Sequence, residues 1–174
     1  ADLYKSTSSG WSQVALGREL SFTSGGTYVI AEGDTITGGT STETAVVTRV
    51  MLESGSFAGG DAVGRLIFAS QSGAFQSEVL DVGANSDVAT IAGDSSAITL
   101  VPGGRFEMIR ENFAGQLGTL RIYGADGKNR AFEFDGTVFC PIDTGIATDT
   151  PTHVAVHKNH LFLSFASSAQ HSAI

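Results

Sequence analysis

Histidine is the residue type in this 174-residue chain whose spacing best fits a metal site. The four histidines stand close together in the sequence: His153, His157, His160 and His171. If Lys158 and Asn159 form a two-residue turn, His157 and His160 face each other across a hairpin, with His153 on the same side. Three imidazoles on one face can coordinate a transition metal, but an exposed polar face is the commoner meaning. No carboxylate adjoins them in sequence, so we predict no metal and keep His153, His157 and His160 as candidates.

Other residues that could do chemistry lack the neighbours that the chemistry needs. Cys140 precedes Pro141 without the cationic surroundings that activate a thiol, so we predict a small apolar residue in a sheet. The sequence has no nucleophile elbow, phosphate loop or dinucleotide motif, and its acidic turns lack calcium-loop spacing. We therefore predict no catalytic residue, no cofactor and no enzyme. A hydrolase whose paired carboxylates meet only in space is the last-ranked hypothesis.

Three aromatic residues are candidates for contact with a ligand or a partner: Trp11, Tyr28 and Tyr123. Exposed aromatic rings stack on sugars, and the same residue types also fill sheet faces and subunit contacts. Both meanings stay open at the level of the sequence.

The composition favours many short strands joined by tight turns. Charged residues make up 16% and glycines number 22, whereas a helical bundle would be rich in Leu, Ala, Lys and Glu at helical spacing. The formal net charge of −8 disfavours a grip on phosphates, so we expect no sequence-specific nucleic-acid partner. No apolar run approaches the length of a membrane-spanning helix. The single cysteine excludes an internal disulfide.

Apolar and β-branched runs place strands along the first half of the chain. Residues 44–52, TAVVTRVML, alternate between two faces, and residues 65–69, RLIFA, fit a strand buried on both faces. The motif SGSF at 54–57 recurs as SGAF at 72–75. In each copy the glycine permits a turn and the phenylalanine fills an apolar layer. These similar hairpins predict a small β-barrel, preceded by a turn at Ser24-Gly25-Gly26.

The second half predicts an antiparallel meander of five strands with short links. The runs lie at 120–123, 130–134, 137–139, 154–157 and 161–165. A two-residue Asp135-Gly136 turn would place Phe134 opposite Thr137. Residues 106–113 could form two helical turns, but the preceding glycines cap a helix poorly, and we favour a strand that begins near Arg105.

The fold class we predict is all-β, built from antiparallel hairpins and meanders. Residues 17–22 and 104–109 are similar in kind and could be neighbours in one sheet. On that basis residues 1–26 and 104–174 form an outer, propeller-blade-like sheet module, and residues 27–103 form an inserted small β-barrel.

Several segments resemble tailed-bacteriophage virion proteins. They are GDTITGGTS at 33–41 with TAVVT at 44–48, SGAFQSE at 72–78, and TPTHV through HKNHLF at 150–162. The first two are similar to glycine-rich turn motifs of those proteins, with Glu43 standing where glycine is commoner. The last is similar to blade strands of propeller-like tail and neck proteins. The resemblance implies a virion component and carries no catalytic residues.

We therefore predict a structural component of a bacteriophage virion, in the tail, neck or fibre, that acts by symmetric assembly. Its partners would be other virion proteins and copies of itself in a trimer, hexamer or dodecamer. The alternative is a carbohydrate- or receptor-binding module of a host-attachment fibre, for which an exposed aromatic in a concave site would be the signature.

Overall fold

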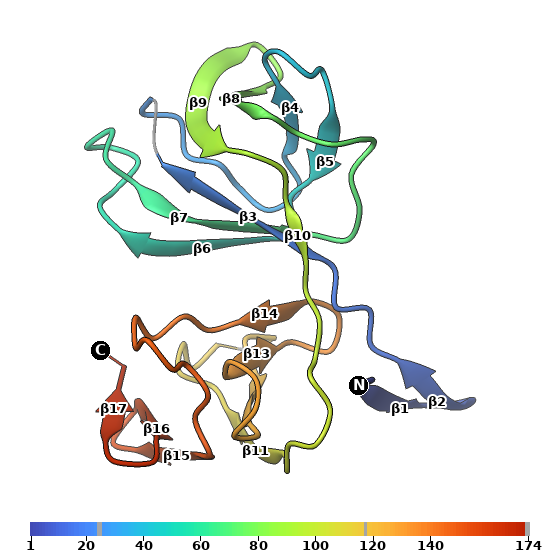
Figure 1. The fold of residues 1–174 in the computed structure, drawn as a ribbon, viewed down its shortest axis with the longest axis vertical. Helices are drawn as coiled ribbons and strands as arrows, with labels where there is room; N and C mark the ends of the chain where they lie inside the picture. Colours follow the sequence, from blue (N-terminus) through green and yellow to red (C-terminus); the bar gives the residue numbers. More distant parts are fainter. Residues whose placement is uncertain (24–25, 117, 173–174) are drawn as a thin grey trace. The chain divides into compact units, whose positions relative to one another are not determined.

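The structure is a computed structural model, and it describes residues 1–23, 26–116 and 118–172. Within these residues every helix or strand element is a β-strand and all the paired strands run antiparallel (Figure 1), which confirms the predicted all-β class. The same residues contain no helix of the length and apolar character that a bilayer crossing requires. The predicted turn at Ser24-Gly25-Gly26 falls in part outside the described residues.

The chain divides into two compact units, Leu16–Ile98 and Ala1–Ala15 with Thr99–Ile174. The inserted unit therefore begins before β3 (Arg18–Thr23), whereas the sequence placed its start after that strand. Residues 17–22 and 104–109 are not sheet neighbours, because β3 pairs with β7 over its whole length. Leu20 and Phe22 of β3 are buried in the core of the inserted unit, which explains why the strand belongs there.

The inserted unit is one eight-stranded sheet in the order β5-β4-β8-β9-β3-β7-β6, with β10 added beside β3. Its strands after β3 are β4 (Thr35–Gly38), β5 (Thr44–Val46), β6 (Arg49–Ser54), β7 (Val63–Phe68), β8 (Ser77–Val82), β9 (Asn85–Ala92) and β10 (Ser96–Ala97). The sheet curls around a single apolar cluster that includes Phe57 and Phe75. The phenylalanines of the repeated motif therefore fill the core, as the sequence predicted.

The predicted barrel is not closed by strand pairing in the part of the chain that is described. The sheet order ends at β5 and β6, which are consecutive segments of the single strand predicted at 44–52. Val47 leaves the ladder and exchanges backbone hydrogen bonds with Gly33 and Asp34, while the Thr48 amide donates to the Ile67 carbonyl. The chain bends at these two residues and runs directly from β5 to β6, so the two end strands of the sheet are linked by the backbone without pairing with each other.

In its described residues, the second unit contains three small sheets. They are a hairpin of β1 (Tyr4–Thr7) and β2 (Gly10–Gln13), a meander of β11 (Glu107–Glu111), β12 (Arg121–Ala125), β13 (Phe132–Phe134) and β14 (Phe139–Pro141), and a sheet of β15 (His153–His157), β16 (His160–Ser164) and β17 (Ala169–His171). The strand β11 confirms the preference for a strand over a helix near Arg105. The predicted five-strand meander is split, because β15 and β16 pair in a separate sheet.

The two predicted hairpin turns had different outcomes. His157 pairs with His160 across a two-residue turn in which Lys158 and Asn159 both have positive φ, as expected. The Asp135-Gly136 turn is longer than predicted, since Phe134 pairs with Phe139 instead of Thr137. The Asp135 carboxylate accepts hydrogen bonds from the amides of Thr137 and Val138 and so holds a wider loop.

Candidate functional site

The β1–β2 hairpin is the most exposed pair of strands in the described part of the molecule. Thr7 pairs with Gly10 across a two-residue Ser8-Ser9 turn, and the ladder runs back to Tyr4 and Gln13. None of its eight strand residues is buried, and within the described residues neither strand pairs with a third. Its two outer edges therefore present unpaired backbone N–H and C=O groups, which other strands can use as a template.

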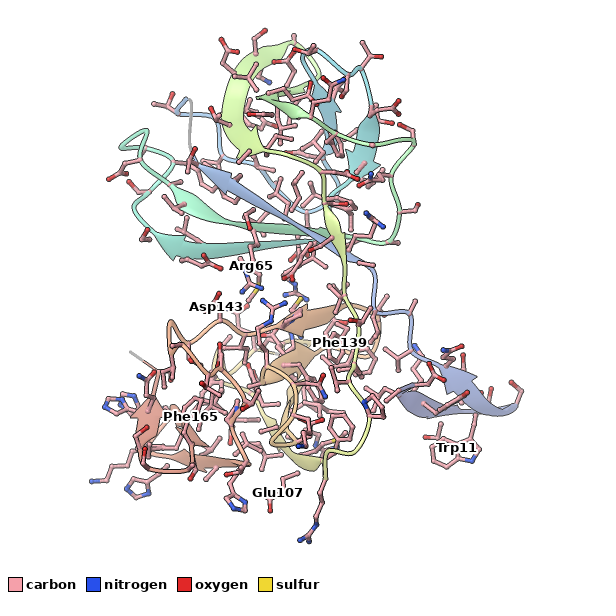
Figure 2. All side chains as sticks on the ribbon, viewed as in Figure 1. Trp11, Arg65, Glu107, Phe139, Asp143 and Phe165 are labelled. Carbon is pink, nitrogen blue, oxygen red and sulfur yellow. The ribbon has the colours of Figure 1, made fainter. Side chains whose placement is uncertain are left out.

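One face of this hairpin carries two exposed aromatic side chains. Trp11 is 76% exposed and Tyr4 is 54% exposed. Tyr4 pairs with Gln13 and Ser6 pairs with Trp11, so these four side chains lie on the same face because strand residues alternate. Figure 2 shows the Trp11 ring projecting from the hairpin. Exposed apolar rings that gather on one face can mark a surface for interaction with a partner.

The hairpin segment is nearly free of charge in a strongly acidic protein. Residues 1–15 contain one acid, Asp2, and one base, Lys5, while the whole chain carries a net −8. The Asp2 carboxylate accepts a hydrogen bond from the Gln13 amide at 2.9 Å. Two copies that approach through this segment meet little of the repulsion that the remaining surface would impose.

The other two aromatic candidates are not exposed platforms. Tyr123 on β12 is buried and packs against Phe113, with ring centroids 5.2 Å apart. Tyr28 is half-buried against the core of the inserted unit, and its hydroxyl donates to Asp34 at 3.2 Å. Of the three sequence candidates, Trp11 alone has the exposure that a contact residue needs. Tyr4 was missed, although the Ser8-Ser9-Gly10 turn signal could have placed it beside Trp11.

The histidine-rich face forms as predicted, but its groups have individual partners. His157 and His160 are directly opposed, and His160 and His171 lie with ring centroids 5.2 Å apart. The Nδ1–H groups of His160 and His171 both donate to the Ser172 carbonyl, at 2.6 and 3.0 Å. His153 instead lies 2.9 Å from the Glu107 carboxylate, a partner distant in sequence. Among the described residues no three His, Cys, Asp or Glu side chains are placed to hold a metal ion.

Two carboxylates converge on one buried arginine in the inserted unit. Glu19 and Glu53 both form ion pairs with the guanidinium of Arg65, at 2.8 and 2.5 Å. Different nitrogen atoms of the guanidinium serve the two acids, Nε for Glu53 and Nη1 for Glu19. Cys140 is fully buried in β14, as expected for an apolar sheet residue.

Two of the segments that carry the phage resemblance, 33–48 and 72–78, are neighbours in the inserted unit, whereas 150–162 belongs to the other unit. The Glu78 carboxylate accepts hydrogen bonds from the amides of Thr40 and Ser41, at 2.7 and 2.8 Å, and from the Ser41 hydroxyl at 2.7 Å. The Ser72 hydroxyl lies within hydrogen-bond distance of the Thr44 amide and of Glu43. Residues 33–48 and 72–78 therefore form one structural element, in which the acids tie a turn in place.

No family model, no curated protein and no solved structure matches this chain.

Proposed function

We propose that this chain is a non-enzymatic structural component of a bacteriophage virion and that it assembles with copies of itself through the β1–β2 hairpin. The observation that carries the proposal is the exposure of this hairpin, with Tyr4 and Trp11 on one face and two unpaired edges. A two-stranded hairpin is only marginally stable in water by itself. Burial of its aromatic face against a second copy stabilises both the hairpin and the assembly.

The charge distribution supports a contact between the hairpins of two identical copies. The segment 1–15 is neutral in formal charge, since Asp2 and Lys5 cancel. Edge-to-edge pairing of two identical hairpins is self-complementary, because an antiparallel ladder places the same donors and acceptors on both sides of a two-fold axis. A cyclic trimer, hexamer or dodecamer would require a head-to-tail contact, in which the aromatic face meets a different surface of the next copy.

The virion assignment rests on the motif resemblance at 33–48 and 72–78 together with the absence of a catalytic motif in the sequence. These residues form one turn-rich element built around Glu78. Such an element supplies shape and stability, which is the contribution expected of a particle component in the tail, neck or fibre. The partners would then be other virion proteins.

The test is the solution mass by light scattering over a range of concentrations, followed by electron microscopy of the assembly. We expect a defined oligomer in the wild type, and we expect Trp11→Ser to shift it toward monomer by tenfold or more in dissociation constant, since about 1.5–3 kcal/mol accompanies burial of a large side chain. Val29→Ser, at another exposed apolar residue in the other unit, is the matched control and should leave the mass unchanged.

A wild-type protein that is monomeric at every concentration would contradict assembly by this chain alone. An oligomer that Trp11→Ser leaves intact would show that another surface mediates the contact. A closed ring in the micrographs would support a particle component with cyclic symmetry.

The exposure of Trp11 also favours the alternative function, a carbohydrate- or receptor-binding module of an attachment fibre. The indole shares its face with the polar side chains of Ser6 and Gln13, which is a combination that sugars recognise by stacking and hydrogen bonding. Glycan-array binding by the wild type that disappears in Trp11→Ala would select this function over assembly. Tyr28 and Tyr123 contribute nothing to it, because neither ring is free.

A further inference from the structure

An apolar pocket of about 510 Å³ lies beneath the hairpin, on the side that faces the β11–β14 meander. Its walls include Leu3, Tyr4, Lys5 and Val14 around the hairpin, and Met108, Ile122, Phe132 and Phe134 on the meander. The pairs Ile122–Phe134 and Gly124–Phe132 put these meander side chains on one face of the sheet. Pockets of this volume hold small organic ligands.

The meander builds this face around a glycine. A Cβ atom at Gly124 would lie 2.4 Å from the Phe132 ring, so the phenylalanine ring covers this position only because the side chain is absent. Phe132 then stacks on Phe139 with centroids 4.7 Å apart and meets Phe106 edge-on at 6.0 Å. The pocket floor is therefore held by packed aromatic rings, and it is in place before any ligand arrives.

Lys5 is the one charged residue among those that line the pocket. Its ammonium donates a hydrogen bond to the Gly136 carbonyl and lies 5.9 Å from the centroid of the Phe134 ring. An ammonium has three N–H donors, so two can serve a ligand while the first holds the side chain at the pocket. A fixed cation beside an apolar wall is complementary to a molecule with an apolar body and one anionic end.

We propose that this pocket binds a small amphipathic anion, namely an aliphatic monocarboxylate of medium chain length. The hydrocarbon chain lies against Met108, Ile122 and Phe134, and the carboxylate accepts hydrogen bonds from the Lys5 ammonium. Trp11 does not line the pocket, and its side chain projects from the opposite face of the hairpin from Lys5, so the pocket can be tested separately from the Trp11 contact.

The experiment is isothermal titration calorimetry of the full chain with decanoate, and with decan-1-ol as the uncharged ligand of equal chain length. We expect saturable decanoate binding, weakened about tenfold to a hundredfold in Lys5→Met because a charge-assisted hydrogen bond is lost. The affinity for decan-1-ol should change less than about threefold in that variant, because its apolar contacts are kept. Lys5→Arg should restore much of the decanoate affinity, since it keeps the charge.

Met108→Glu tests the pocket mouth without touching the buried floor, since Met108 is exposed. The added charge should weaken decanoate binding about tenfold while circular dichroism shows an unchanged fold. Trp11→Ser should leave the affinity unchanged, and light scattering on the same sample separates this site from the assembly contact. The proposal is overturned by a folded wild type that binds no decanoate, by equal decanoate affinity in Lys5→Met, or by loss of binding in Trp11→Ser.

Discussion

At the residue scale, Glu78 is a carboxylate held in place by several hydrogen bonds in the inserted unit. Its side chain is 7% exposed, and its two oxygens accept from Thr40, Ser41 and Gln76. Burial by itself raises the pKa, but the hydrogen bonds outweigh it and lower the pKa of Glu78 from 4.5 to about 2. The charged form is therefore the form that stabilises the turn.

Replacement of this residue should destabilise the inserted unit. In Glu78→Gln the amide group presents N–H donors to amides that need an acceptor, and we expect a loss of about 2–3 kcal/mol in the free energy of unfolding. Glu32→Gln is the matched control, because the Glu32 side chain is mostly exposed and forms an ion pair with Arg49; it should cost less than about 1 kcal/mol. Urea denaturation at pH 7 measures both, and equal losses would contradict the role assigned to Glu78.

The same residue predicts how stability depends on pH. Its pKa is lower in the folded protein than the ordinary value of 4.5, so its contribution is fully present above pH 4.5 and is lost as the pH falls toward 2. The difference in unfolding free energy between wild type and Glu78→Gln should therefore shrink between pH 5 and pH 2.5. A difference that is constant over this range would mean that the Glu78 pKa is not lowered.

At the scale of elements, the crossing strand shows how alternation and bending combine. Val46 at the end of β5 is 52% exposed, and the next residue, Val47, is 1% exposed in the apolar cluster. Alternation along a strand predicts opposite faces for neighbouring residues. The chain then bends at Val47 and Thr48, so that β5 pairs with β4 before the bend and β6 pairs with β7 after it. Val47 therefore lies between the two end strands of the sheet, β5 and β6, and its side chain is buried in the apolar cluster.

The two neighbouring valines form a matched pair for mutation. Val47→Asp buries an unpaired carboxylate and should cost about 3–5 kcal/mol or unfold the inserted unit. Val46→Asp places the same side chain in solvent and should cost less than about 1 kcal/mol. Thermal unfolding of the two variants measures the difference, and a Val47→Asp protein as stable as wild type would contradict the burial of this position.

At the scale of the whole molecule, the inserted unit supplies all the residues of its own apolar core. All members of its apolar cluster, from Leu20 to Ile91, lie within Leu16–Ile98. The strand β3 pairs with β7 over six residues and adds β10, so removal of β3 would expose the backbone edge of β7 and one wall of the core.

The unit boundaries can be tested with two fragments. A fragment of residues 16–98 should fold alone, with a β-type circular dichroism spectrum and cooperative urea unfolding. A fragment of residues 27–103, which has the boundaries expected from the sequence, lacks β3 and should remain unfolded. If the fragment of residues 27–103 folded, β3 would be dispensable and the unit boundaries expected from the sequence would be correct.

The class of the fold and much of its local structure follow from the amino-acid sequence alone. Alternation and β-branched runs predicted antiparallel strands, the Lys158-Asn159 turn predicted the register that pairs His157 with His160, and the repeated motif predicted the buried phenylalanines. These features depend on neighbours within a few residues, where side-chain period and turn conformation act directly.

Only the tertiary structure decided which strands became neighbours and which aromatic residues stayed exposed. Residues 17–22 and 104–109 have similar patterns, yet β3 joins β7 because its apolar face completes a distant core. Glu78 contacts the turn at residues 40–41, and Glu107 contacts His153. In both cases the partner is distant in sequence. The exposure of Trp11, the burial of Tyr123 and the pocket beside Lys5 all depend on which strand covers which face, and local propensity does not specify that choice.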